Sequence, residues 1–165
     1  MIIDEINKAW SFYRAKGLKE VLFSLEAPFL IQFGKYGVCG VISALVFTLA
    51  IFLGEYLAPQ YFTSDLPLQQ IAWNTAALHL IAFLPSNTFT YMLNRWFVFR
   101  SGRHSPRKEF MLFTLISLIS FILGEIIPFW LINHSDLPRP AIHLAFIVAV
   151  AIANYTCRKL FVFEK

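Results

Sequence analysis

Charged residues are scarce in this sequence: 15% of its 165 residues are Asp, Glu, Lys or Arg, whereas soluble domains usually contain about 25%. Cysteine is rarer still, since Cys39 and Cys157 are the two thiols and they form no CxxC pair. This scarcity excludes a disulfide-rich scaffold and a cysteine-based zinc site, and we expect both thiols to be unpaired. Metal-ligand spacing, a nucleophile–base pair and a phosphate loop are likewise missing. We therefore expect no metal, no cofactor and no enzymatic activity.

Apolar residues are correspondingly abundant. The chain is 58% hydrophobic, contains eighteen Phe and has a mean hydropathy of +0.61. One small core cannot bury so much apolar surface, so much of it must face lipid. A bilayer-crossing helix needs about 20 mostly apolar residues, and the segments that meet this need are about 33–57, 68–93, 110–132 and 141–160. The sequence predicts an all-α integral membrane protein whose four transmembrane helices occupy residues 33–163.

Positive charge is distributed unevenly about these four predicted spans. Of the 14 Lys and Arg residues, only Arg139 falls on the side opposite to the others. Because Lys and Arg concentrate in cytoplasmic loops, we expect a multi-pass protein of the cytoplasmic (inner) membrane with both termini in the cytoplasm. The concentration of Lys and Arg in cytoplasmic loops also explains the net charge of +4. Because the sequence contains no nucleic-acid motif, we expect no nucleic-acid partner. The first 27 residues contain no apolar core of a signal peptide, and we expect none to be cleaved.

Residues 1–32 differ from the rest because they mix charged and apolar residues. The apolar residues recur near helical spacing and the basic ones fall elsewhere on the helical wheel, which predicts an amphipathic helix lying at the membrane interface. Gly17 is expected to interrupt this helix. The alternative is a partly ordered tail.

The chain contains signs of an internal repeat. Tyr91 and Tyr155 are each followed four residues later by a basic residue, Arg95 or Lys159, and then by an aromatic-valine-phenylalanine run, at an offset of 64 residues. The first and third spans share a Leu-Gly-Glu triplet, at a different offset of 70 residues. Two spans per repeat preserve orientation, so the sequence predicts two parallel two-helix repeats.

These endings also resemble a known family. The Asn94-Arg95-x-x-Val98-Phe99 ending, its counterpart over residues 158–163 and the glycine-rich first span after Phe33 are similar to those of the GtrA-like family, over about residues 32–163. The resemblance implies a role in cell-surface polysaccharide synthesis, in which a polyprenyl-phosphate-linked sugar moves across the membrane, often alongside a membrane glycosyltransferase. The stretch before Phe33 is longer than the family pattern and leaves room for a specialised partner or lipid contact.

Basic residues at the predicted cytoplasmic ends of the spans are candidates for binding the lipid phosphate. Arginine presents a planar fork that fits phosphate oxygens, and lysine supplies a compact positive charge. The candidates are Arg95, Asn94, Arg158, Lys159 and Lys35. The alternative is that these side chains reach the interface only to fix the topology.

Polar residues within the spans are candidates for a sugar or proton site, because a charge in hydrocarbon is unfavourable by at least about 2.5 kcal/mol. The candidates are Glu125, Glu55, Asn87 and Asn154. The alternatives are hydrated carboxylates near the interface and hydrogen bonds of the two asparagines between helices. His79 and His143 align in the repeat. A proton relay is one interpretation of this pair, and helix packing or exposure at the interface is the alternative. Pro85 is expected to kink the second span.

Three functions remain open from the sequence. The first is translocation of a lipid-linked sugar, for which four helices scarcely enclose a path, so a homodimer or an open lateral groove is expected. The second is a non-transporting subunit that anchors or positions a glycosyltransferase through Arg103, Arg107 or Lys108. The third is a proton-coupled exporter of cationic drugs, for which aromatic residues would suit the cation. Membrane lipids are partners in every case.

Overall fold

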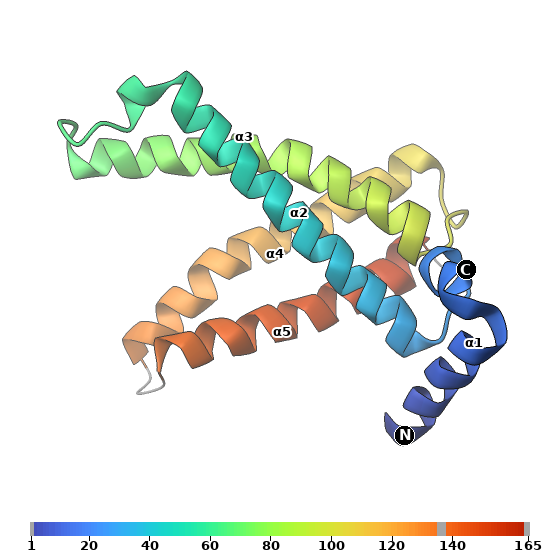
Figure 1. Ribbon diagram of the computed structural model, residues 1–165. Helices are drawn as coiled ribbons and strands as arrows, with labels where there is room; N and C mark the ends of the chain where they lie inside the picture. Colours follow the sequence, from blue (N-terminus) through green and yellow to red (C-terminus); the bar gives the residue numbers. More distant parts are fainter. Residues whose placement is uncertain (1, 135–137, 164–165) are drawn as a thin grey trace. The chain divides into compact units, whose positions relative to one another are not determined.

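A computed structural model describes residues 2–134 and 138–163, apart from the side chains at positions 2, 125, 129, 133, 139 and 143. The described residues contain helices and no strands, so the predicted all-α class is confirmed (Figure 1). The helices are α1 (Ile2–Phe23), α2 (Phe29–Leu57), η1 (Pro59–Tyr61), α3 (Leu68–Leu93), η2 (Asn94–Val98), α4 (Pro106–His134), α5 (Arg139–Cys157) and η3 (Arg158–Phe163). They form two compact units: Met1–Tyr36 with Arg95–Lys165, and Gly37–Asn94.

Among the described residues, three helices are long and apolar enough to cross a bilayer. They are Phe29–Leu57, Pro106–Ile132 and Pro140–Phe163, and they make the chain a membrane protein. α3 has the bounds predicted for the second span and contains 26 residues. It is less apolar than the other three because its first half includes Gln69, Gln70 and Asn74.

The unit of residues 37–94 is built by α3 packing on the larger part of α2. The two helices approach closely at Gly54, where a Cβ atom would lie 2.3 Å from Leu78 Cδ1. The Ser86 hydroxyl donates a 2.9 Å hydrogen bond to the Ser43 carbonyl. α3 continues through Pro85, the position of the predicted kink, without a break in the helix.

In the other unit, α5 contacts α4. The Ser120 hydroxyl on α4 donates a 2.6 Å hydrogen bond to Asn154 Oδ1 on α5. Pro128 lies inside α4, which nevertheless runs to His134. An apolar groove of about 600 Å³ is lined by residues 123–131 of α4 and residues 141–153 of α5, and its α5 lining includes Ala141, Ala145, Ala149 and Ala153.

α1 is helical on both sides of a kink at Gly17, where φ is +76° and the backbone adopts a conformation that favours glycine. The predicted interruption at this residue is therefore present. Trp10 and Tyr13 are exposed, and their ring centroids are 5.7 Å apart. The Glu5 carboxylate accepts a 2.7 Å hydrogen bond from Lys8 and, through that bond and its charge, raises the pKa of the lysine.

α3 and α5 end in the same way. Each passes into a π-helical turn, η2 or η3, whose first residue, Asn94 or Arg158, donates its backbone N–H to two preceding carbonyls. Phe99 and Phe163, which follow at matching positions, are fully buried. Their rings stack with centroids 5.0 Å apart and an interplanar angle of 11°. The last residues of the two similar endings therefore meet in the core of the unit formed by residues 1–36 and 95–165.

Candidate functional site

Aromatic rings surround Tyr155 at the end of α5, beside the polar residues of the candidate site. Tyr155 is buried, and its ring lies edge-on to Phe33 at 5.2 Å and to Tyr36 at 5.5 Å. Phe99 lies 5.4 Å from the same ring. Aromatic pairs at these separations stabilise a fixed arrangement beyond the area they bury. The polar side chains described below are therefore anchored on a rigid base.

Gln32, one turn after the start of α2, lies at the centre of this arrangement. Its side chain is 2% exposed, and its Nε2 donates a 2.9 Å hydrogen bond to the Val98 carbonyl. Its Oε1 accepts hydrogen bonds from the Tyr155 hydroxyl at 2.6 Å and from Lys159 Nζ at 2.9 Å. Residues far apart in the sequence are thus joined through one amide.

Arg158, a predicted phosphate-binding residue, is directed into the interior. Its guanidinium donates from Nη1 to the Tyr36 hydroxyl at 3.0 Å and from Nη2 to Ser117 Oγ at 2.8 Å. The group also lies 3.9 Å from the centroid of the Phe113 ring, a cation–π contact. The residue is 5% exposed. The structure thus uses both ends of the arginine fork to join α2, α4 and η3.

The other predicted phosphate-binding residues occupy separate positions. Lys35 is 9% exposed and donates a 2.6 Å hydrogen bond to the Ser24 carbonyl, which ties α2 to the turn before it. Arg95 Nη1 lies 3.6 Å from Glu109 Oε2. Asn94 is buried and donates from its side chain to the Thr90 carbonyl at 2.8 Å.

The segment between η2 and α4 carries further basic residues that contact η3. Arg103 Nη1 donates to the Leu160 carbonyl, and a ring nitrogen of His104 lies 3.1 Å from the Phe161 carbonyl. The Gly102 N–H donates a 3.0 Å hydrogen bond to the buried carboxylate of Glu109. Because the last carbonyls of a helix have no partner within that helix, the Arg103 and His104 side chains interact with groups that η3 does not satisfy itself.

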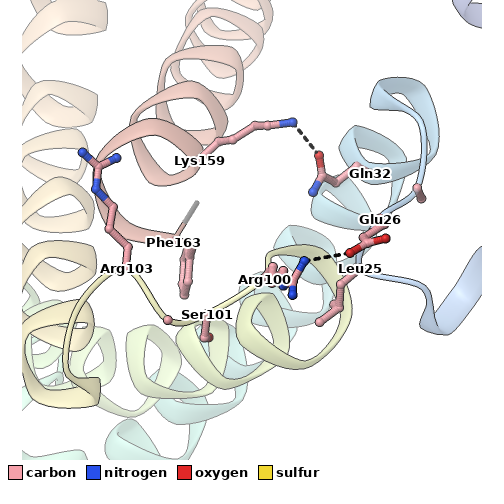
Figure 2. Close-up of a pocket in the computed structure, with 10 residues that line it drawn as sticks. Leu25, Glu26, Gln32, Arg100, Ser101, Arg103, Lys159 and Phe163 are labelled. Carbon is pink, nitrogen blue, oxygen red and sulfur yellow. Dashed lines mark hydrogen bonds and ion pairs between the residues drawn. The ribbon is translucent and has the colours of Figure 1, made fainter. Parts of the chain in front are cut away.

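A pocket of about 650 Å³ opens beside this segment. Its charged and polar lining consists of Glu26, Gln32, Arg100, Ser101, Arg103 and Lys159 (Figure 2). Three of these side chains are cationic, and the one acid, Glu26, is exposed and pairs with Arg100 at 2.8 Å. The lining therefore carries an excess of positive charge and suits an anion. Of the five predicted phosphate-binding residues, Lys159 lines this pocket.

The predicted sugar or proton residues are divided between the two units. Glu55 is exposed and Asn87 is buried, and both belong to the unit of residues 37–94. Asn154 belongs to the other unit, where it accepts the hydrogen bond from Ser120 described above. The side chain of Glu125 lies outside the described residues, as does that of His143. His79 packs on Phe47, with ring centroids 5.7 Å apart.

Several residues of the site were missed from the sequence. Gln32 carried no signal except its polarity at the start of an apolar segment, and Glu109 looked like one more charge in a basic stretch. Tyr155 was visible in the repeat, although its role was not. No group of three or more His, Cys, Asp or Glu within the described part of the chain is arranged to hold a metal ion.

Comparison with known proteins gives one match. Residues 32–163 match the family described as GtrA/DPMS, transmembrane domain. No curated protein and no solved structure matches the chain significantly.

Proposed function

Because the chain belongs to the GtrA/DPMS transmembrane domain family, we propose that it flips a polyprenyl-phosphate-linked sugar across the cytoplasmic membrane for cell-surface polysaccharide or glycan modification. The family is associated with movement of membrane-linked sugars in polysaccharide synthesis, and its members are generally non-catalytic. The observation that carries the proposal is the basic pocket beside Lys159. No covalent step is needed, and the chain acts as a transporter.

In this proposal α2, α3, α4 and α5 each cross the membrane, and both termini lie in the cytoplasm. At about 1.5 Å per residue, the 26 residues of α3 extend about 39 Å, which exceeds a hydrocarbon core of about 30 Å. The one-sided distribution of Lys and Arg supports the even number of spans. The matching π-helical ends of α3 and α5 support two parallel repeats.

The pocket then receives the phosphate on the cytoplasmic side. A phosphodiester that links a sugar to a polyprenol carries one negative charge, which Lys159, Arg100 and Arg103 attract. An inside-negative potential favours outward movement of this charge by about 2.3 kcal/mol per 100 mV for a full crossing. Toward the outer face, Glu125 or Glu55 meets the sugar or binds a proton, each on its own helix, and Asn87 and Asn154 are further candidates for contact with the headgroup.

α1 lies at the membrane interface beside this pocket. Its exposed side chains include Ile3, Ile6 and Trp10 before the kink and Leu22 and Phe23 after it. Apolar residues of this kind enter the boundary between headgroups and acyl chains, while charged residues stay in water. The segment holds the entrance of the pocket at the level of the lipid phosphates.

A second candidate function is a non-transporting subunit that positions a membrane glycosyltransferase. The observation that favours it is the exposure of Arg107 and Lys108 on the first turn of α4. Neither residue lines the basic pocket. Substitution of this pair therefore separates the two functions.

The deciding experiment reconstitutes the purified protein in liposomes that contain a sugar-labelled polyprenyl phosphodiester. The rate at which the sugar becomes accessible on the opposite face is measured with an imposed potential. We expect Lys159→Gln to slow this movement at least about tenfold, because removal of a charged partner is unfavourable by more than about 1.4 kcal/mol. Arg107→Gln with Lys108→Gln is the matched control and should leave the rate unchanged.

Movement no faster than in protein-free liposomes, across several sugars, would contradict translocation. In that case co-purification with a glycosyltransferase, lost on substitution of Arg107 and Lys108 and retained with Lys159→Gln, would support the second function.

A further inference from the structure

Gln32 is a neutral residue of the pocket lining whose side chain makes three hydrogen bonds. It is 2% exposed, and its amide joins the Val98 carbonyl, the Tyr155 hydroxyl and the Lys159 ammonium, as Figure 2 shows for the last of these. A buried polar group is tolerated in a core only when it is hydrogen-bonded. The Val98 carbonyl and the Tyr155 hydroxyl account for one hydrogen bond on each end of the amide, and the bond from Lys159 is additional to them.

The chemistry of its neighbours determines which way the amide points. The Val98 carbonyl accepts hydrogen bonds only, whereas the Lys159 ammonium can only donate. A flipped amide would place its oxygen against the carbonyl and its NH₂ group against the ammonium, and both contacts would be repulsive. The oxygen therefore faces Lys159, and that direction is set by Lys159 itself together with the Val98 carbonyl, which lies outside the pocket lining.

The neutrality of this acceptor matters for the pocket. A carboxylate at the same place would hold Lys159 equally well but would cancel its charge for any ligand. An amide oxygen holds the ammonium by hydrogen bonding and leaves its charge in place. Gln32 thus combines a fixed lysine position with a positive potential in the pocket.

We propose that Gln32 is a positioning residue, which holds the Lys159 ammonium at the wall of the pocket without neutralising it and so sets the affinity for a phosphate-bearing lipid headgroup. This inference rests on the proposed function, because it concerns the same pocket. It adds a residue outside the predicted phosphate-binding set and a reason for an amide at that position.

The first test is a double-mutant cycle on binding of a short-chain polyprenyl phosphodiester to the full-length protein in nanodiscs. Gln32→Met should weaken binding about tenfold, as expected when a hydrogen bond to a charged group is lost. In a Lys159→Met background the same change should weaken binding less than about threefold, because the two residues act as one unit. Gln70→Met, at an exposed glutamine of α3, is the matched control and should change nothing. Equal effects of Gln32→Met in both backgrounds would overturn the proposal.

The second test uses Gln32→Glu, which retains an acceptor for Lys159 and adds a negative charge. We expect weaker binding than in the wild type and a shallower dependence of affinity on salt, since one positive charge of the pocket is offset. Wild-type affinity with an unchanged salt dependence would show that neutrality at this position is irrelevant, and the proposal would fail. If Gln32→Met does not fold, Gln32→Glu still tests the proposal, because it keeps an acceptor for Lys159.

The third test is independent of any ligand. Isotope-coded acetylation followed by mass spectrometry measures how fast the Lys159 amine reacts. Gln32→Met should accelerate its labelling, and Gln70→Met should not. If labelling accelerates but the wild type does not distinguish the phosphodiester from the neutral polyprenol, the proposed function fails while the positioning role stands. If labelling is unchanged, the positioning role fails whatever the protein transports.

Discussion

Conversion of Arg158 to lysine tests whether this arginine supports the core or binds the substrate. The substitution keeps a positive charge and a long side chain but removes the planar fork. In the structure the fork reaches the Tyr36 hydroxyl and Ser117 Oγ from different nitrogens. One ammonium cannot occupy both positions and also keep the guanidinium's place 3.9 Å from the centroid of the Phe113 ring.

The expected loss of stability follows from these contacts. A hydrogen bond to a charged group contributes about 1.5–3 kcal/mol, and a desolvated cation–π contact contributes about 0.5–2 kcal/mol. Loss of one such bond and most of the ring contact should lower the free energy of unfolding by about 3 kcal/mol. For a chain of this size that corresponds to a fall in Tm of about 6–12 °C.

The assay is thermal unfolding of the purified protein in detergent, followed by intrinsic fluorescence and by the fraction that remains monodisperse. Arg107→Lys provides the matched control, because the same exchange at an exposed position of α4 should change stability by less than about 0.5 kcal/mol. Lipid binding is measured on both variants below their unfolding temperatures.

The reasoning is refuted if Arg158→Lys unfolds within about 2 °C of the wild type. An unchanged Tm together with lost phosphodiester binding would instead assign Arg158 to the substrate, as the sequence-based hypothesis does. A lowered Tm with binding retained in the folded fraction is the result we expect.

Two further predictions concern helix packing. Gly54→Ala should destabilise the protein by about 1–2 kcal/mol, because the added Cβ would overlap Leu78, whereas Gly124→Ala should be tolerated, since its nearest neighbour lies at an ordinary 3.6 Å; thermal unfolding of both variants checks the difference. Ser120→Ala and Asn154→Leu should each destabilise by about 0.6–1.7 kcal/mol, and the double variant should lose no more than the larger single effect if the hydrogen bond between them is what matters.

The sequence alone was sufficient for the features that are encoded locally along the chain: the positions of the helices, the family and the interruption at Gly17. Long apolar segments are needed wherever backbone groups must be satisfied inside lipid, so the helices could be located, and α3 has the predicted bounds. The endings at residues 94–99 and 158–163 and the glycine-rich first span, taken together with the four predicted spans, indicated the family, which the match over residues 32–163 confirms. Gly17 was expected to interrupt the first helix because glycine populates positive φ more readily than other residues.

Only the tertiary structure decided what each polar residue does. Arg158 and Lys159 are adjacent basic residues and look equivalent in the sequence, yet one contacts Phe113 in the interior and the other lines the pocket. Gln32 lies 127 positions before its partner Lys159. No local pattern encodes such a pair, because a side chain's role depends on which distant groups the packed helices bring within hydrogen-bond distance. Hydropathy and charge act through the surrounding lipid and water, so the positions of the helices and the orientation they predict can be derived from the order of residues. Hydrogen-bond partners of side chains are determined only once the helices have packed.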